Sequence, residues 1–241
     1  MQEFIKTAQA EEAFAMCNTV LGARQYSRIG QITGDPGTGK STLTTWLAEE
    51  LGGVRVECWM DMGDKALLEE IANGLNALGE SLDVTGTAPT LFRKIKGACD
   101  GKLIIIDEAN QLKWATLEKL RGLSDIGGAG LVLAGTDILA KRLVEARVRV
   151  YLTQLRQRIG AKKVLMQPIT DDAELAAYVI APRFGQVTKA TAKRFRILSR
   201  GEWRSALELA DACERLMANE GLEKIDERVV ETAAAWMAGR S

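Results

Sequence analysis

The sequence predicts an α/β fold with a five-stranded parallel sheet, followed by a small all-helical subdomain. Short apolar runs alternate with amphipathic helical stretches over residues 27–166, a pattern typical of a parallel sheet covered by helices. A glycine-rich loop at residues 34–41 joins the first apolar run to a helical stretch. After Pro168 the helical stretches follow one another without a strand. We therefore expect an N-terminal helix and α/β core at residues 1–168, and a helical subdomain at 169–241.

Apolar periodicity places each element along the chain. Residues up to Gly22 are expected to form one helix, packed on the core or on a neighbour. The isoleucines at residues 104–106 suit a strand buried on both faces. Thr170 or Asp171 is a suitable N-cap for the first helix of the subdomain. The expected strands are 28–33, 54–60, 102–107, 130–135 and 162–167, and the expected helices are 41–51, 64–78, 88–98, 114–123, 170–184, 188–200, 203–220 and 225–239.

Composition excludes several kinds of chemistry. The 241 residues are 46% hydrophobic and 27% charged, with a formal net charge of zero, as in ordinary globular proteins. Histidine is absent, which removes Ser-His and Cys-His nucleophiles and most zinc chemistry. No apolar run approaches the roughly 18 residues of a membrane span, so we expect a cytoplasmic protein with no membrane partner. The cysteines form no CxxC pair and are expected to be buried, reduced thiols: Cys17, Cys58, Cys99 and Cys213.

The glycine-rich loop has the pattern of a phosphate-binding loop. GDPGTGKS fits G-x-x-x-x-G-K-[ST] at every fixed position and lies between a predicted strand and a predicted helix. Backbone N–H groups of the turn would cradle phosphates, Lys40 would reach the β- and γ-phosphates, and Ser41 would coordinate Mg²⁺. A chance glycine-rich turn before a helix is the alternative. The residues expected at ATP are Gly34, Asp35, Pro36, Gly37, Thr38, Gly39, Lys40, Ser41 and Thr42.

Two acidic residues end the third predicted strand, in the run LIIIDEA. An Asp at the carboxyl end of a buried strand can hold the magnesium shell, and the Glu beside it can polarise a water molecule. Asp107 is therefore expected at the metal and with the nucleotide, and Glu108 is expected as the general base. The alternative is an acidic pair that only stabilises a helix N-terminus.

Three further positions are candidates for sensing or stabilising the γ-phosphate. Thr136 follows the strand GLVLAG and is the candidate sensor, although this residue and Asp137 could merely turn the chain or cap a helix. An arginine of the stretch YLTQLRQRIGAKK, which contains Arg156 and Arg158, could reach the nucleotide of a neighbouring subunit. Arg204 lies on the first turn of a helix, where the helix dipole disfavours a cation and a phosphate partner becomes attractive.

Together these residues resemble an AAA+ ATPase with its helical lid. The resemblance rests on the phosphate loop at 34–41, the DE pair, the polar residue at Thr136, an arginine in RQRIG and the GxxR of GEWR, and it covers nearly the whole chain. The LRQRIG, QPIT and GEWR segments are most similar to the origin-recognition clade, and the layout is similar to the phage and Tn7-type transposition regulators. By this resemblance Thr136 is sensor 1, Arg158 is the trans-acting finger with Arg156 as the second choice, and Arg204 is sensor 2.

The resemblance also implies a function. It implies an ATP- and Mg²⁺-dependent homo-oligomer, a helical filament or ring, that forms on double-stranded DNA, selects target sites and stimulates a partner transposase. A helicase loader on single-stranded DNA remains an alternative within the same fold. A nucleotide-switched signalling or secretion ATPase that binds protein alone is an alternative from another class.

Charge distribution decides where DNA could bind, because the net charge is zero. Residues 141–163 are rich in basic side chains against the single acid Glu145, which suits a subunit interface, a DNA-facing surface or a solvated helix face. In similar regulators, loops near the second strand and after the DE strand contact the DNA backbone, and such contacts are weakly sequence-specific. By that resemblance the candidates are Lys65, Lys113 and Arg121.

Overall fold

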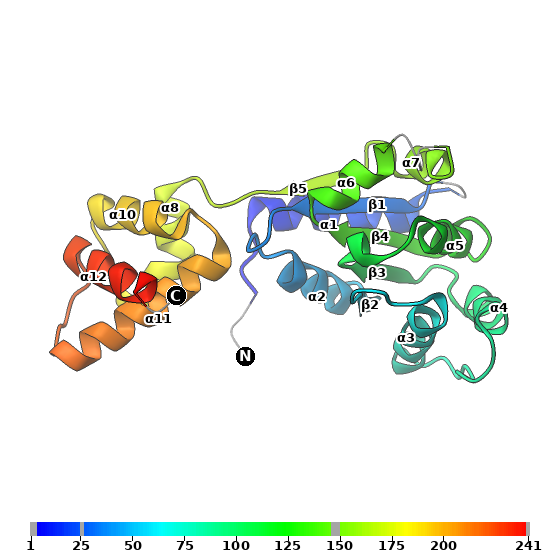
Figure 1. Cartoon of the computed structure of the whole chain (residues 1–241), viewed down its shortest axis with the longest axis horizontal. Coiled ribbons are helices and arrows are strands. Elements are labelled where there is room, and N and C mark those ends of the chain that lie inside the picture. Colours follow the sequence, from blue (N-terminus) through cyan, green and yellow to red (C-terminus); the bar gives the residue numbers. More distant parts are fainter. Residues whose placement is uncertain (1–3, 25–26, 146–149, 240–241) are drawn as a thin grey trace. The chain divides into compact units, whose positions relative to one another are not determined.

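A five-stranded sheet forms the centre of the first of two compact units (Figure 1). The first unit comprises the described residues of Met1–Asp35 and Lys40–Met166. The second comprises Pro36–Gly39 and the described residues of Gln167–Ser241. The predicted α/β class is confirmed. The structure, a computed structural model, describes residues 4–24, 27–145 and 150–239.

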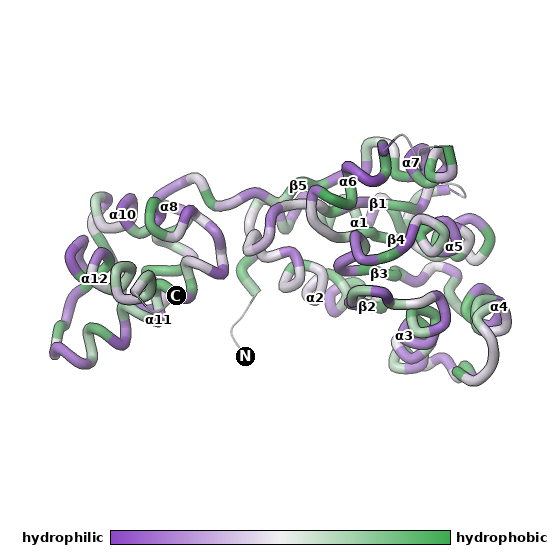
Figure 2. Tube along the Cα trace, viewed as in Figure 1, coloured by the Kyte–Doolittle hydropathy of each residue, from purple (hydrophilic) through white to green (hydrophobic). Residues whose placement is uncertain are grey.

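Every pair of neighbouring strands in the sheet is parallel. The strands are β1 (Ile29–Gly34), β2 (Val54–Glu57), β3 (Leu103–Asp107), β4 (Gly130–Gly135) and β5 (Lys163–Met166), in the spatial order β2-β3-β4-β1-β5. All residues of β3 and β4 are buried, because helices cover both faces of the sheet. Figure 2 shows the hydrophobic colouring of these two strands.

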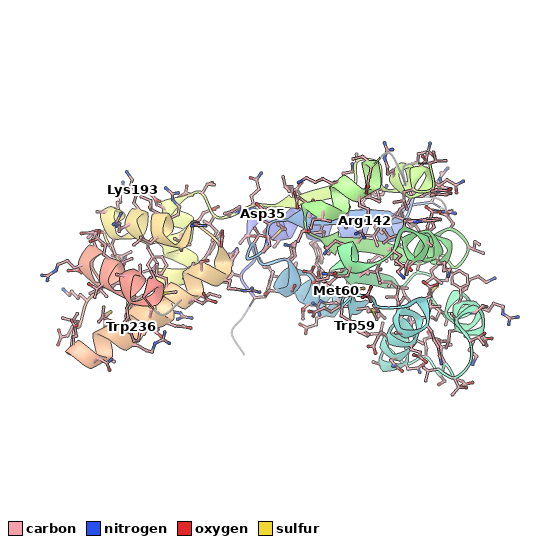
Figure 3. All side chains as sticks on the ribbon, viewed as in Figure 1. Asp35, Trp59, Met60, Arg142, Lys193 and Trp236 are labelled. Atoms are coloured by element: carbon pink, nitrogen blue, oxygen red, sulfur yellow. The ribbon has the colours of Figure 1, made fainter. Side chains whose placement is uncertain are left out.

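The second strand is shorter than the sequence predicts. It was expected to reach Met60 but ends at Glu57, and the large side chains of Trp59 and Met60 are exposed (Figure 3). Asp61, with a φ of 61°, has a left-handed backbone that a strand cannot accommodate. The apolar residues that suggested a longer strand therefore belong to a surface loop.

One face of the sheet is covered by helices α1 (Ala8–Gly22) and α2 (Lys40–Glu50), whose apolar residues pack on Ile32, Ile105 and Val132. The N-terminal helix thus packs on the core. The opposite face packs through Ile104, Ile106 and other strand residues against the remaining core helices. These are α3 (Asp64–Ala77), α4 (Ala88–Ala98), α5 (Trp114–Asp125), α6 (Asp137–Val144) and α7 (Thr153–Ile159).

The second unit is helical and has its own apolar core around the fully buried Phe195. Asp171 is the N-cap of its first helix and accepts hydrogen bonds from Ala173 N and Glu174 N. The predicted helix 170–184 contains a π-helical turn just before Pro182, which lacks the N–H that would continue the ladder. The elements are α8 (Asp172–Leu175), η2 (Ala176–Ile180), α9 (Ala181–Phe184), α10 (Lys189–Ser199), α11 (Trp203–Glu220) and α12 (Glu227–Ala238).

Two expectations from composition can be compared with this fold. All four cysteines are free and buried, as predicted. Within the described ranges, no helix is both long and apolar enough to cross a membrane.

Candidate nucleotide-binding and hydrolysis site

The order of the strands brings the predicted site residues to one edge of the sheet. β4 lies between β3 and β1, and the three strands are parallel, so their carboxyl ends meet at the same edge. The phosphate loop follows β1, Asp107 and Glu108 end β3, and Thr136 follows β4. The carboxyl edge of a parallel sheet is where α/β proteins place their ligands.

The phosphate loop has the backbone that its glycines allow. Gly37 and Gly39 have φ values of 84° and 88°, which side chains disfavour. A Cβ on Gly34 would lie 2.4 Å from the carbonyl oxygen of Met166 on β5, so only glycine fits there. The buried Lys40 donates from Nζ to the carbonyl oxygens of Gly34 and Asp35, both at 2.8 Å. An ammonium group at the start of α2 can donate a charge-assisted hydrogen bond to a phosphate.

Asp107 is fully buried, at 0% exposure, and its carboxylate is already bound on both oxygens. Oδ1 accepts from the N–H of Glu108 at 3.0 Å. Oδ2 accepts from Thr44 Oγ1 at 3.0 Å and from Arg55 Nη2 at 2.7 Å. Arg55 also donates to Thr44 Oγ1 at 3.0 Å and to Glu57 at 2.9 Å. Although burial alone would lower the pKa of Arg55, its hydrogen bonds to Asp107 and Glu57 raise that pKa above its usual value.

Ser41 and Asp107 fit a magnesium ion that takes most of its ligands from the nucleotide and from water. Ser41 is the second residue of α2 and its side chain is exposed, so its hydroxyl is accessible to an ion. Asp107 already accepts three hydrogen bonds from its own chain, which favours contact with the ion through a water molecule. In the part of the chain that the structure describes, no group of three or more Cys, Asp or Glu residues could hold a metal alone. Mg²⁺ typically takes one or two protein ligands and keeps phosphate and water as the others.

Glu108 has a left-handed backbone, with φ 52° and ψ 36°, which is uncommon for a residue with a side chain. Its Oε2 accepts a hydrogen bond from Asn110 Nδ2 at 3.2 Å. Asn110 lies in the 3₁₀ turn η1 (Ala109–Gln111), and its Oδ1 accepts from the N–H of Thr136 at 2.9 Å. The predicted base and the predicted sensor are therefore joined through one amide side chain.

Thr136 is at the N-cap position of α6, but its side chain makes no capping hydrogen bond. Its Oγ1 is buried and has no hydrogen-bond partner among the described residues. Asp137 pairs instead with Lys141 one turn along α6. A buried hydroxyl with unused hydrogen-bonding capacity, at the edge shared by the phosphate loop and the DE pair, is suited to a phosphate oxygen.

The two candidate finger arginines differ in their contacts. Arg158 donates from Nε to Oδ1 of the buried Asp125 at 3.0 Å, which ties α7 to α5. Arg121, a candidate for DNA contact, binds the same carboxylate and also Glu118 at 2.8 Å. Arg156 is half-buried, and its side chain makes no hydrogen bond or salt bridge within the described residues. The structure thus commits Arg158 and Arg121 to the fold of their own chain.

The remaining candidates lie in different settings. Lys65 is exposed and pairs with Glu69 at 3.5 Å, one turn along α3. Lys113 is exposed at the N-terminus of α5 and forms no salt bridge within the described ranges. Arg204 belongs to the second unit, where it is the second residue of α11 and is exposed. In the basic segment 141–163, Arg147 and Arg149 lie outside the described residues.

Sequence reasoning missed Arg55 and Asn110. Arg55 interrupts the apolar pattern of β2, and the strand register places Glu57 opposite Asp107. Asn110 follows the DE pair by two residues and is only 9% exposed. The sequence did contain a signal for both residues, because each is a charged or amide residue within or next to an apolar stretch near a motif.

A phosphate loop, an acidic pair and a polar residue on neighbouring strands define a nucleotide-binding protein of the P-loop class. Residues 23–143 match the family described as AAA domain, and the chain belongs to that family. It is 31% identical over 147 residues to the Mu-like prophage FluMu DNA transposition protein B of Haemophilus influenzae, covering 58% of this chain and 48% of that protein. The chain thus spans about half the length of that relative.

A second relative matches over more of its length. The chain is 24% identical to a potential ATP-binding protein of Staphylococcus aureus, covering 96% of this chain and 95% of that protein. Among solved structures, the ORC2 protein of Aeropyrum pernix in its ADP form has a TM-score of 0.67, with 18% identity over 98% of this chain and 71% of that chain. Cdc6p of Pyrobaculum aerophilum has a TM-score of 0.69, with 16% identity over 93% and 65%. These structural likenesses establish the fold.

Proposed function

We propose that this protein is an ATP-dependent, DNA-binding AAA+ ATPase that assembles on double-stranded DNA and activates a transposase at target sites. The observation that carries the ATPase part is that β1, β3 and β4, which lead into the phosphate loop, the DE pair and Thr136, end at the same edge of the sheet. The DNA transposition part is supported by the 31% identity to transposition protein B over 147 residues.

Each side chain at the edge has a role in this proposal. Lys40 would neutralise charge on the β- and γ-phosphates, and Ser41 and Asp107 would hold Mg²⁺. When bound, the ion would supply positive charge against the transferred phosphoryl group. Glu108 orients and deprotonates the attacking water, and Thr136 hydrogen-bonds the γ-phosphate. Arg204 acts as a second phosphate sensor.

Substitutions separate binding from hydrolysis. Lys40→Ala is expected to lose ATP binding and, with it, DNA binding, because assembly requires the triphosphate. Glu108→Gln is expected to bind ATP and to form longer-lived DNA complexes, because hydrolysis normally ends them. Filaments of Lys40→Ala that form undiminished without nucleotide would contradict the coupling. Loss of ATP binding in a folded Glu108→Gln variant would contradict the role of Glu108.

We further propose Arg156, rather than Arg158, as the arginine that reaches the nucleotide of a neighbouring subunit. Arg158 already binds the buried Asp125, whereas Arg156 has no such partner in the described part of the chain. Arg156→Ala should fold normally and lose about 10³- to 10⁵-fold in assembly-stimulated hydrolysis. Mixing it with Glu108→Gln, which still binds ATP and assembles, should restore part of that rate, since each variant supplies the group that the other lacks. Failure of the mixture to recover any activity, with both variants co-assembled, would exclude action in trans.

For DNA contact, the proposal favours Lys113 over Lys65 and Arg121. Lys65 is paired with Glu69 and Arg121 with Glu118 and Asp125, whereas Lys113 is exposed without a salt bridge within the described ranges. Each phosphate contact contributes about 0.9 to the slope of log K against log salt concentration. Lys113→Ala should lower that slope by about one such step, and Lys65→Ala should change it less.

The deciding experiment is negative-stain electron microscopy of the protein with double-stranded DNA, under ATP, a slowly hydrolysed analogue, ADP and no nucleotide. Filaments or stacked rings on DNA under the triphosphates alone are the expected result. Isolated particles that ignore DNA in every state would overturn the DNA-binding proposal and favour a protein-binding ATPase. Assembly on single strands in preference to duplex would instead favour a helicase loader.

A further inference from the structure

Asn110 connects two residues from neighbouring strands. Its Nδ2 donates to Glu108 Oε2 at 3.2 Å, at the end of β3, and its Oδ1 accepts from the N–H of Thr136 at 2.9 Å, after β4. The two contacts fix the orientation of the amide, because a backbone N–H can only donate and an ionised carboxylate can only accept. The side chain is 9% exposed, so its hydrogen bonds are largely shielded from water.

Neighbouring residues leave space for the Asn110 side chain and bind its backbone. A Cβ on Gly135 would lie 2.3 Å from Asn110 Oδ1, so the residue before Thr136 has to be glycine for the amide to fit. Arg142 donates from Nη1 to the carbonyl oxygens of Asn110 and Leu112, at 2.9 and 2.6 Å. Arg142, labelled in Figure 3, comes from α6, the helix that begins just after Thr136. The loops after β3 and β4 are therefore joined at both the side chain and the backbone of Asn110.

We propose that Asn110 is a positioning residue that couples the γ-phosphate sensor to the general base. This inference rests on the proposed ATPase function. A phosphate oxygen that binds the Thr136 hydroxyl would move the loop after β4, and the N–H of Thr136 in that loop is hydrogen-bonded to Asn110. Because the amide group is rigid and both its ends are bound, a shift of that loop also shifts the carboxylate of Glu108. Nucleotide with a γ-phosphate thus sets the orientation of Glu108, and ADP does not.

The test compares Asn110→Leu, which keeps the approximate shape and removes both hydrogen bonds, with a matched control. Asn76→Leu is that control, because Asn76 also makes two side-chain hydrogen bonds, both to the backbone of Leu82, away from the site. Asn110→Leu should lower kcat for ATP about 10- to 100-fold, the effect of losing a partner that orients a functional group. The KM for ATP should stay close to the wild-type value. Asn76→Leu should leave kcat unchanged.

A binding measurement gives a readout that does not depend on turnover. Fluorescent-nucleotide titration gives the ratio of affinities for a slowly hydrolysed ATP analogue and for ADP. Asn110→Leu and Thr136→Ala, singly and together, form a double-mutant cycle for this ratio. Coupling between Asn110 and Thr136 should appear as a non-additivity of about fivefold or more. Gly135→Ala, which displaces the amide by collision, should reproduce the loss of kcat in a folded protein.

The outcomes separate the two proposals. A wild-type chain that hydrolyses ATP, together with a folded Asn110→Leu variant of unchanged kcat, would overturn this inference and leave the proposed function standing. Strict additivity in the cycle would also overturn it. A wild-type chain that neither binds nor hydrolyses ATP would overturn the proposed function and this inference with it. Urea unfolding of each variant establishes that the compared proteins are folded.

Discussion

Asp107 and Asp125 are both buried carboxylates bound to arginine, yet they serve different parts of the molecule. Asp107 is 0% exposed at the end of β3 and binds Arg55. Asp125 is 4% exposed at the end of α5 and binds Arg121 and Arg158. The first cluster continues through Thr44 to the carbonyl oxygen of Ser41, within the candidate site. The second joins two helices that cover the sheet.

The chemistry of a buried arginine–carboxylate pair does not by itself show whether the pair serves a binding site or the fold. Removing water from both charges is costly, and such a pair is weak evidence for stability by itself. What distinguishes Asp107 is its location at the carboxyl edge of β3, where an added cation can share its charge. Asp125 has two arginines in its own chain, and the proposal gives it no ligand.

Arg55→Met should destabilise the nucleotide-free protein by about 3–5 kcal/mol, because it leaves the buried Asp107 without its cation. Saturating Mg²⁺ and ATP should recover part of this loss beyond the stabilisation seen for wild type, since the bound ion brings positive charge to the same carboxylate. Urea unfolding with and without Mg²⁺ and ATP measures both. Equal nucleotide stabilisation of the variant and the wild type would remove the proposed link between Asp107 and the ion.

Two buried thiols can report on the two clusters separately. Burial, together with the charges of Asp107, Glu108 and Glu57, raises the pKa of Cys58 from 9.0 to about 12. Burial chiefly raises the pKa of Cys99, which lies against Gly127 beyond the end of α5, to about 11. Both groups stay protonated in the folded state at pH 8, so alkylation at that pH requires local opening.

Nucleotide at 100 times its Kd should slow alkylation of Cys58 about 100-fold, equivalent to about 2.7 kcal/mol, if the opening is incompatible with binding. Cys99 should be protected much less. Mass spectrometry of time-resolved alkylation at pH 8 identifies each site. Equal protection of both thiols would mean that the whole unit opens at once and that the two clusters do not act separately.

The raised pKa values of the same thiols make the free energy of unfolding depend on pH. Above about pH 9 the unfolded chain loses thiol protons that the folded chain still holds. The unfolded state then binds fewer protons, so the free energy of unfolding falls as pH rises through this range. The four-cysteine chain should therefore be less stable at pH 10 than at pH 8, and replacing Cys58 by Ala should reduce that difference. A stability that rises between these pH values would contradict the assignment.

Arg158→Met should cost about 1.5–3 kcal/mol, the range for a hydrogen bond to a charged group. The expected loss is smaller than for Arg55→Met because Asp125 keeps Arg121. Mg²⁺ and ATP should stabilise this variant by the same amount as wild type, since its cluster does not include the ion. Urea unfolding checks both points, with Arg156→Met as the matched control on the same helix. An extra recovery with Mg²⁺ and ATP would place Arg158 at the nucleotide after all.

The strands and motifs were predictable from the sequence because they depend on neighbours along the chain. Residues 34–41 and the DE pair are local patterns, and the run of isoleucines in β3 indicates burial on both faces. The partners of these residues are not local. Arg55 meets Asp107, and Asn110 meets Thr136, only because the sheet places β3 between β2 and β4.

The choice between Arg156 and Arg158 could not be made from sequence for the same reason. The two residues lie two positions apart on α7, and so on different sides of that helix. Which side packs against α5 follows from the tertiary contact with Asp125, which is 33 residues away along the chain. Similarly, β2 stops at Glu57 because its neighbour β3 ends opposite it, at Asp107, and an apolar pattern that continues through Met60 does not report where the neighbouring strand ends.

Thr44→Val gives the smallest and most specific effect. Thr44 Oγ1 lies 3.0 Å from each of three partners, Asp107 Oδ2, Ser41 O and Arg55 Nε, and has one proton to donate. Valine keeps the shape and removes the hydroxyl, which should cost about 1 kcal/mol, because Asp107 retains Arg55 and the N–H of Glu108. Thr44→Ser, which retains the hydroxyl, is the control.

The stability loss alone would not distinguish Thr44 from an ordinary buried hydroxyl, so the informative quantity is the Mg²⁺ dependence of ATP binding. Asp107 and the first turn of α2 are joined through Thr44, and losing an outer-shell partner typically lowers metal affinity about 10- to 100-fold. We expect Thr44→Val to lie at the low end of that range, since two hydrogen bonds to Asp107 remain. Thr44→Val could instead lose stability without any change in the Mg²⁺ concentration that ATP binding requires. That outcome would mean that the Asp107 cluster only stabilises the packing of strands and helix, as the Asp125 cluster stabilises the packing of two helices.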